Sequence, residues 1–263
     1  MSQRMSSLGM KRFEGKTALV TGATSGIGQA TAIRLAAEGA VVAVNQLPEV
    51  DATETLQRIS EVGGKGFPVV CDVSIPDAIR EMISDIVRQM GHLDLVVSNA
   101  AINPHIEWDR ITDDLWDRIH DTNLRGTWVV CQAAAKEMIR EGHGGAIVGV
   151  SSISAWVGAS MQVAYTPSKA GVSSLMKSLA IVLGPHGIRC NAVLPGSILT
   201  NMNRGKLLPG SKRLAEREQR CPLGRVGQPE DVAGVIAFLL SEDANYINGA
   251  ELLVDGGWLV NLE

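Results

Sequence analysis

The chain has 263 residues and a formal charge of −4, with 45% hydrophobic and 20% charged residues. These values are typical of a globular protein with a large core, and the mild acidity argues against a nucleic acid or an anionic membrane as a partner. The sequence contains no run of about 18 or more apolar residues, so it predicts no membrane-spanning helix.

The first residues and the cysteines bear on processing and location. Residues 1–12 lack the apolar segment of a signal peptide, and we expect them to form a disordered N-terminal extension. The four cysteines show no C-x-x-C spacing, and three lie in or beside apolar runs, which favours reduced, buried thiols in the cytoplasm. The five histidines show no metal-ligand spacing, so no metal site is predicted.

The N-terminal part has the pattern of a strand, a glycine turn and a helix. Residues 17–20 are apolar, residues 21–28 contain G-x-x-x-G-x-G, and a helix ending near residue 39 precedes a second strand over 41–44. Such glycines let a pyrophosphate approach the helix N-terminus, where unpaired N–H groups favour anions. We therefore favour a dinucleotide site over a purely structural turn. Its candidate contacts are Gly22, Thr24, Ser25, Gly26, Ile27 and Gly28.

The end of the second strand bears on the choice of dinucleotide. An acidic residue about 20 positions after the glycines would hold the adenosine ribose hydroxyls, but Asn45 and Gln46 stand there and no arginine is near. The choice between NAD and NADP stays open, with NAD favoured because no cation is available for a 2′-phosphate. Asn45 and Gln46 are candidate cofactor contacts.

Strands and helices alternate to the C-terminus. Helices are predicted over 51–62, 77–90, about 112–140 with room for a bend near Gly126, 165–183 and 229–240, and strands over 67–70, 93–97, 145–150, 188–194 and 252–254. This order predicts an α/β fold: a single Rossmann-type domain over 13–263, with a doubly wound parallel sheet of about seven strands and helices on both faces. Residues 201–221 have few apolar anchors, and we expect a mobile, lid-like segment there.

Polar residues follow several of these strands. Asp72, with Val73 after it, either accepts a hydrogen bond from the adenine amine or caps its own loop. Asn99 and Ala100 follow the fourth strand. Asn123 lies inside a predicted helix, where asparagine is a mediocre helix former, and its alternative role is a polar contact in the interior.

Tyr165 and Lys169 are spaced for acid–base chemistry. Residues four apart share one face of a helix, and an ammonium beside a tyrosine, whose ordinary pKa is about 10, lowers that pKa. Tyr165 could then take a proton from an alcohol or return one to a carbonyl. Ser152, thirteen residues earlier, could hold the same substrate oxygen. Taken alone, the Y-x-x-x-K spacing favours a surface pair; the rest of the chain favours a catalytic one.

From Lys16 to the C-terminus, the sequence resembles the short-chain dehydrogenase/reductase family. The motifs that carry the resemblance are T-G-x-x-x-G-x-G at 21–28, Asp72-Val73, Asn99-Ala100, Asn123, Ser152, Tyr165-x-x-x-Lys169 and Pro195-Gly196 followed by Thr200. One departure is Ser98-Asn99-Ala100-Ala101 in place of the family's N-N-A-G. The family usually forms tetramers, so the resemblance implies a homotetramer.

The resemblance also implies roles for the matching residues. Tyr165 would be the general acid or base, Ser152 would stabilise the reacting oxygen, and Lys169 would hold the nicotinamide ribose. Asn123 would position a water in the proton relay, and Thr200 would bind the carboxamide. Further cofactor contacts would come from Pro195, Gly196 and Ile198.

A narrower resemblance is to sugar 1-dehydrogenases, L-rhamnose 1-dehydrogenases among them. It is carried by residues 44–48, 151–155, 162, 165–167, 187–192, 252–257 and 260–262. It implies oxidation of the C1 hydroxyl of an aldose to the lactone. Trp156 and Ala164 depart from that group's pattern. Candidate substrate contacts are Ser152, Ser154, Gln162, Tyr165 and Asn203, with loop solvation as the alternative for Ser154 and Gln162.

Two other functions stay open. One is a carbonyl reductase acting on 3-oxoacyl thioesters or ketones, for which Arg204, Lys206, Lys212 and Arg213 would supply a basic patch near the site. The other is a non-catalytic dinucleotide sensor on the same fold, against which the intact set of serine, tyrosine and lysine argues.

Overall fold

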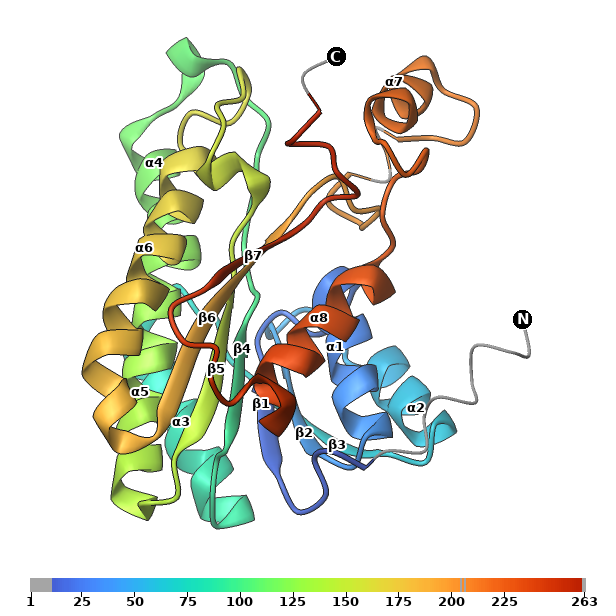
Figure 1. The fold of residues 1–263 in the computed structure, drawn as a ribbon. Helices are drawn as coiled ribbons and strands as arrows, with labels where there is room; N and C mark the ends of the chain where they lie inside the picture. The colour runs from blue at the N-terminus through green and yellow to red at the C-terminus, as the bar shows by residue number, and fades with distance from the viewer. Residues whose placement is uncertain (1–10, 204, 206, 262–263) are drawn as a thin grey trace.

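A seven-stranded parallel sheet with the order β3-β2-β1-β4-β5-β6-β7 forms the centre of the protein (Figure 1). The computed structural model describes residues 11–203, 205 and 207–261. The strands are β1 (Thr17–Val20), β2 (Val41–Gln46), β3 (Lys65–Val70), β4 (Leu95–Ser98), β5 (Gly145–Val150), β6 (Ile188–Pro195) and β7 (Glu251–Val254). The predicted doubly wound Rossmann-type sheet is confirmed.

Helices cover both faces of this sheet (Figure 1). One face carries α3 (Pro76–Met90), α4 (Asp113–His120), α5 (Gly126–Glu141) and α6 (Tyr165–Leu183), and the other carries α1 (Gly26–Ala37), α2 (Thr53–Glu61) and α8 (Pro229–Leu240). Successive strand residues point to opposite faces, so Leu19 packs into one core and Val20 into the other. No helix in the described chain has both the length and the apolar character needed to cross a membrane.

The long helix predicted over 112–140 is interrupted in its middle. A π-helical turn over Asp121–Arg125 separates α4 from α5 and contains Asn123. Gly126 follows at once, and a Cβ there would lie 2.4 Å from the Val73 carbonyl oxygen. Glycine therefore lets α5 begin directly against the loop after β3. π-Turns inside helices are rare and occur often at functional sites.

The segment expected to be a lid contains a helix that the sequence analysis did not predict. This helix, α7 (Lys212–Arg220), stands apart from both helical layers (Figure 1). Ser211 caps it, because its Oγ accepts from the Leu214 N–H at 3.2 Å. Buried Leu207 and Cys221 anchor the chain on either side of it. The mobility of the segment stays a prediction.

The sequence predicts a disordered N-terminal extension over residues 1–12, and residues 1–10 of it lie outside the described residues. Arg12 belongs to the fold, since its guanidinium donates to both carboxylate oxygens of Glu38, at 2.6 and 3.0 Å. Burial acts to raise the pKa of Glu38, but hydrogen bonds from Arg12 and Arg34 bring it below its ordinary value. The four cysteines are free and buried, in line with the expectation of reduced thiols.

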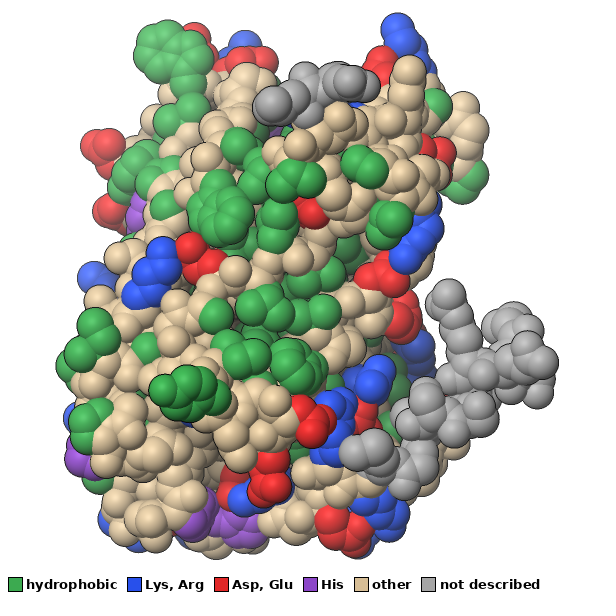
Figure 2. All heavy atoms as spheres, in the orientation of Figure 1, with side chains coloured by type: hydrophobic (Ala, Val, Ile, Leu, Met, Phe, Trp, Pro, Cys, Tyr) green, Lys and Arg blue, Asp and Glu red, His purple; other side chains and the backbone are tan. Residues whose placement is uncertain are grey.

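The C-terminal strand forms one edge of the sheet. β7 pairs with β6 alone among the described strands. On the face shown in Figure 2, hydrophobic side chains gather over the region that β7 crosses. This edge is therefore partly apolar at the surface.

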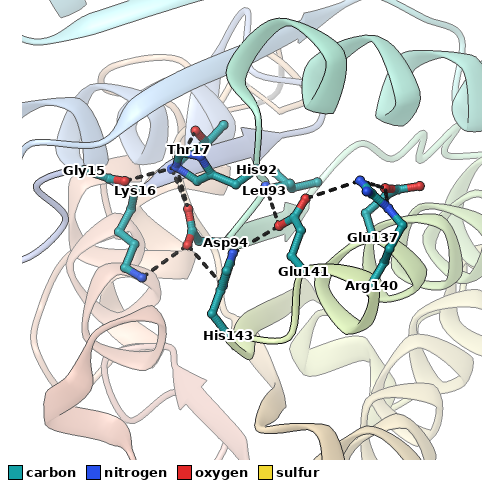
Figure 3. A network of polar contacts seen from close by, with 10 residues as sticks. All are labelled: Gly15, Lys16, Thr17, His92, Leu93, Asp94, Glu137, Arg140, Glu141 and His143. Atoms are coloured by element: carbon teal, nitrogen blue, oxygen red, sulfur yellow. Dashed lines mark hydrogen bonds and ion pairs between the residues drawn. The ribbon is translucent and has the colours of Figure 1, made fainter.

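The amino ends of β1, β4 and β5 meet in a group of polar residues that we call the amino-end network (Figure 3). Asp94 accepts from the Thr17 N–H at 2.8 Å and from Lys16 Nζ at 3.1 Å. His143 contacts Asp94 at 3.7 Å and Glu141 at 3.1 Å. The network comprises Lys16, Thr17, His92, Asp94, Glu141 and His143. It ties the starts of three strands together at the end of the sheet opposite α7 (Figure 1).

Candidate active site

A cavity of about 850 Å³ lies at the carboxyl ends of the strands. From β1 the chain continues to β2 and β3 on one side of the sheet, and β4 to β7 follow on the other. Ligands of open α/β sheets bind at such a reversal of strand order, and the volume falls in the range of natural ligand sites. Of the predicted site residues, all but Gly28 and Asn123 line this cavity.

The turn between β1 and α1 forms one wall. Gly22 and Gly26 have φ values of +60° and +56°, a conformation that L side chains rarely adopt. A Cβ on Gly28 would lie 2.3 Å from the Gly22 carbonyl oxygen, so the turn requires glycine to close. Helix α1 begins with no side-chain cap and no acidic residue in its first turn. Its first N–H groups are therefore suited to an anion such as a pyrophosphate, and the residues fit a dinucleotide.

Asn45 and Asn99 brace this turn. Asn45 is 2% exposed; its Oδ1 accepts from the Gly22 N–H at 3.0 Å, and its Nδ2 donates to the Cys71 carbonyl at 3.1 Å. Asn99 Nδ2 donates to the carbonyls of Thr21 and Gly22, at 2.9 and 3.2 Å. Their amides hold the glycine turn in shape. Both residues also line the cavity, and their contacts with the cofactor stay predictions.

Two other predicted cofactor residues also make local bonds. Gln46 Oε1 accepts from the Ala52 N–H at 3.0 Å, just before α2. Asp72 Oδ1 accepts from the Ser74 N–H at 2.8 Å. Of the two roles considered for Asp72, the loop cap is thus formed. The adenine contact stays a prediction.

Tyr165 and Lys169 lie one turn apart at the start of α6 and are 8% and 3% exposed. The hydroxyls of Tyr165 and Ser152 are hydrogen-bonded. Lys169 Nζ donates to the Val150 carbonyl at 2.8 Å and lies 5.8 Å from the centre of the tyrosine ring. Ser152 is held by the Ser154 N–H, which donates to its Oγ at 3.1 Å. The end of β5 and the start of α6 thus bring the three side chains together.

Burial controls the ionisation of this pair. Desolvation raises the pKa of Tyr165 to about 12, although the hydrogen bond with Ser152 acts to lower it. Desolvation also lowers the pKa of Lys169 to about 8. The expectation that Lys169 brings the tyrosine pKa below its ordinary value is wrong for the protein's own groups, because burial disfavours the phenolate more than its neighbours favour it.

Asn123 is fully buried and contacts α6. Its Oδ1 accepts from the Ile102 N–H at 2.9 Å, and its Nδ2 donates to the Ile102 carbonyl and to Ser168 Oγ, both at 3.0 Å. These bonds join the loop after β4 to α6 and match the polar interior contact considered for Asn123. The water-positioning role stays a prediction.

The predicted substrate residues differ in what they can offer a ligand. Ser154 Oγ donates to Gln162 Oε1 at 3.1 Å, and both residues line the cavity near Tyr165. Their substrate contacts stay predictions. Asn203 also lines the cavity. Its amide bonds within its own turn, donating to the Ile198 carbonyl at 2.7 Å and accepting from the Thr200 N–H at 3.0 Å. A substrate contact by Asn203 stays a prediction.

The sequence analysis missed several cavity residues. Arg118 lines the cavity from α4, Arg217 and Arg220 from α7, and Trp258 from the C-terminal segment. Arg213 also lines it, whereas Arg204 and Lys206 of the expected basic patch lie outside the described residues. The spacing of arginines at 213, 217 and 220 was the available signal, but it indicates a shared face only once the segment is known to be helical.

Comparisons with known proteins agree with this geometry. The family profile described as enoyl-(acyl carrier protein) reductase matches residues 22–259. An L-rhamnose 1-dehydrogenase (NAD(P)(+)) of Sphingomonas sp. is 49% identical over 97% of this chain and 100% of its own. A human (3R)-3-hydroxyacyl-CoA dehydrogenase is 41% identical, covering 96% and 99% of the two chains.

A solved structure extends these likenesses to the fold. A short-chain type dehydrogenase/reductase of Mycobacterium marinum superposes with a TM-score of 0.89 at 36% identity, covering 97% of this chain and 99% of the other. The family profile and the full-length relatives point the same way. The chain belongs to the short-chain dehydrogenase/reductase family and is an NAD(P)-dependent oxidoreductase.

Proposed function

We propose that the protein oxidises the C1 hydroxyl of L-rhamnose or a related aldose to the aldonolactone. The observation that carries this proposal is the near full-length likeness to an L-rhamnose 1-dehydrogenase at 49% identity. The Ser154–Gln162 pair beside Tyr165 supports a substrate with several hydroxyl groups. Buried polar groups of this kind penalise a ligand that leaves them unpaired.

The cavity residues divide between the parts of the dinucleotide. The start of α1 would hold the pyrophosphate, Lys169 the nicotinamide ribose and Thr200 the carboxamide. A Cβ on Gly26 would lie 3.1 Å from Thr200 Cγ2, so Thr200 stands directly beside the glycine turn. Bound oxidised nicotinamide supplies a hydride acceptor and a positive charge.

Tyr165 acts as the general base in this mechanism. The C1 hydroxyl of the sugar hydrogen-bonds to Ser152 and Tyr165, and its proton passes to Tyr165 Oη as hydride leaves C1. Because burial raises the pKa of Tyr165 to about 12, the phenolate needs nearby positive charge. Lys169 contributes that charge while it is protonated, and its pKa of about 8 makes the contribution pH-dependent.

We also infer a preference for NAD over NADP. The described residues that line the cavity at the end of β2 are Asn45, Gln46, Leu47 and Val50, and none of them is cationic. A 2′-phosphate placed there would find no positive side chain, and phosphate sites in proteins are built from cations and N–H groups. Comparing kcat/KM with the two cofactors tests this inference.

We further infer a homotetramer that works in the cytoplasm. The apolar edge at β7 and the exposed Ile181 and Val182 of α6, 78% and 59% exposed, support burial against another copy. The four buried free thiols support a reducing compartment. Light scattering after size-exclusion chromatography tests the oligomeric state.

The proposed activity is tested by initial rates with NAD and NADP across L-rhamnose, L-fucose, L-mannose, L-lyxose, D-glucose and D-galactose. We expect strong turnover of one 6-deoxy or L-sugar, with the corresponding lactone or aldonate as the product. Absence of turnover across the panel, together with reduction of acetoacetyl-CoA, would overturn the sugar assignment.

Reduction of a 3-oxoacyl thioester is the second candidate function. The observation that favours it is the row of arginines that α7 presents to the cavity, because coenzyme A carries several phosphate groups. The acetoacetyl-CoA assay above discriminates between the two functions.

A further inference from the structure

Three arginines on α7 face the cavity together. Arg213, Arg217 and Arg220 are spaced four and three residues apart, so they share one side of the helix, and all three line the cavity. Trp258 holds two of them in place. The Arg220 Cζ lies 3.8 Å and the Arg217 Cζ 5.7 Å from the centre of its indole ring.

Within the described part of the chain, these guanidiniums form no ion pair or hydrogen bond. The one acidic α7 residue that lines the cavity is Glu216, and it lies 3.8 Å from Lys212, which does not line it. Burial lowers the pKa of Arg217, and the neighbouring Arg213 and Arg220 lower it further, while Glu216 acts to raise it. Like charges are thus crowded on one face without an equal number of carboxylates.

Trp258 adds a hydrogen-bond donor to this group. Its Nε1 is buried and has no acceptor among the described residues. Buried N–H groups are nearly always paired in native proteins. A donor without an acceptor next to two guanidiniums is the chemistry of an anion site.

We propose that Arg213, Arg217, Arg220 and Trp258 form a binding site for an oxyanion, a phosphate or carboxylate, on a molecule held in the cavity. The planar fork of a guanidinium matches two oxygens of either group. The negative charge would offset the repulsion between the arginines, and the aromatic ring would keep them oriented in its absence.

Three molecules could supply this oxyanion. The first is the dinucleotide, whose phosphates already have donors at the start of α1. The second is the aldonate, which forms when water opens the lactone ring to a carboxylate and a proton; this source rests on the proposed function. The third is coenzyme A, which belongs to the alternative thioester reductase.

The test compares Arg217→Gln and Arg220→Gln with a matched control, Lys212→Gln. Lys212 lies on the same helix and carries the same charge, but its side chain is 92% exposed and does not line the cavity. Binding of NADH is measured by fluorescence, and binding of L-rhamnonate, L-rhamnose and coenzyme A by calorimetry. Thermal melting checks that every variant is folded.

We expect each cavity variant to bind one of the three anionic ligands about tenfold more weakly, because it loses a charge-assisted hydrogen bond. The control Lys212→Gln should change the affinity for the same ligand by less than about twofold. Uncharged L-rhamnose should bind all proteins alike. Arg220→Lys, which keeps the charge but loses the fork, should recover part of the affinity.

Each outcome decides a source or overturns the site. Weaker NADH binding assigns the oxyanion to the cofactor, and weaker L-rhamnonate binding assigns it to the sugar product. Weaker coenzyme A binding supports the site while counting against the sugar dehydrogenase. Affinities for all three ligands equal to those of Lys212→Gln would overturn the anion site, whether or not the protein oxidises sugars.

Discussion

The two ends of the sheet differ in whether their charged side chains are paired within the protein. At the amino end, Asp94 and Glu141 are surrounded by lysine, histidine and N–H donors, so each buried carboxylate has partners within the protein (Figure 3). At the carboxyl end, Lys169 is buried against a carbonyl group, and the guanidiniums of the three cavity-lining α7 arginines form no ion pair with a carboxylate among the described residues. An internally paired charge needs no ligand, whereas an unpaired charge is costly until a ligand compensates it.

This difference separates stability from function along one sheet. Changes at the amino end should lower the free energy of unfolding and leave turnover intact. Changes at the carboxyl end should alter turnover or ligand affinity with little loss of stability. The unpaired charges at that end do not stabilise the ligand-free fold, so removing one costs little. Four substitutions test the comparison, in order of decreasing expected effect.

Tyr165→Phe should lower kcat by about 10³-fold or more, because it removes the general base while keeping the ring. The affinity for NADH, measured by fluorescence, should change little, and the melting temperature should stay within a few degrees of the wild type, at about 2–4 °C per kcal/mol. Retained turnover would contradict the assignment of Tyr165 as the base.

Asp94→Ala should destabilise the fold by about 2–4 kcal/mol, because it leaves the Thr17 N–H and Lys16 without their acceptor in a buried network. Urea denaturation gives the free energy of unfolding. The control is Asp85→Ala, which breaks an exposed ion pair with Arg88 and should cost less than about 1 kcal/mol. An equal loss of unfolding free energy in both variants, or a large fall in kcat/KM for Asp94→Ala, would contradict the stabilising role of the amino end.

Lys169→Met should flatten the pH dependence of stability. The pKa of Lys169 is lowered to about 8 in the folded protein from an ordinary 10.5, so between these values the unfolded chain binds more protons. Stability therefore rises with pH across that window, by about 2 kcal/mol between pH 7 and 9.5 for this one group. Urea denaturation of the wild type and of Lys169→Met at the two pH values gives the change of the free energy of unfolding with pH. The same change in both proteins would contradict the lowered pKa.

Ser154→Ala should lower kcat/KM for the preferred sugar about fivefold, the effect of one hydrogen bond between neutral groups. Affinity for NADH should not change, because the proposed function assigns Ser154 to the sugar and not to the cofactor. A matched substitution on the exposed surface of α2, Ser60→Ala, serves as the control. If the two variants behave alike, Ser154 does not contact the sugar.

Local sequence pattern was enough for most of the fold and for the shared helical face of Tyr165 and Lys169. Strand and helix periodicity predicted the parallel sheet, and the four-residue spacing placed Tyr165 and Lys169 on one helical face. These features depend on neighbours in the sequence, which is why they could be predicted. The helix over 165–183 agrees with α6 at both ends.

Other features depend on contacts between distant segments. Helix α7 was missed because only Leu214 and Ala215 are apolar within it, so it has almost no apolar periodicity. The bracing roles of Asn45 and Asn99 arise because β1, β2 and β4 are neighbours in the sheet. The raised pKa of Tyr165 follows from the burial of its side chain, which spacing alone does not reveal.

The C-terminal segment connects one end of the chain to the cavity wall. The Leu223 N–H and Cys221 Sγ both contact the Gly256 carbonyl, at 3.3 and 3.4 Å, and Trp258 stacks on Arg220. In protein engineering terms, Trp258 is a built-in fluorophore that touches the cavity wall. Its emission should therefore change when a ligand reaches Arg220, which would make the protein a label-free sensor.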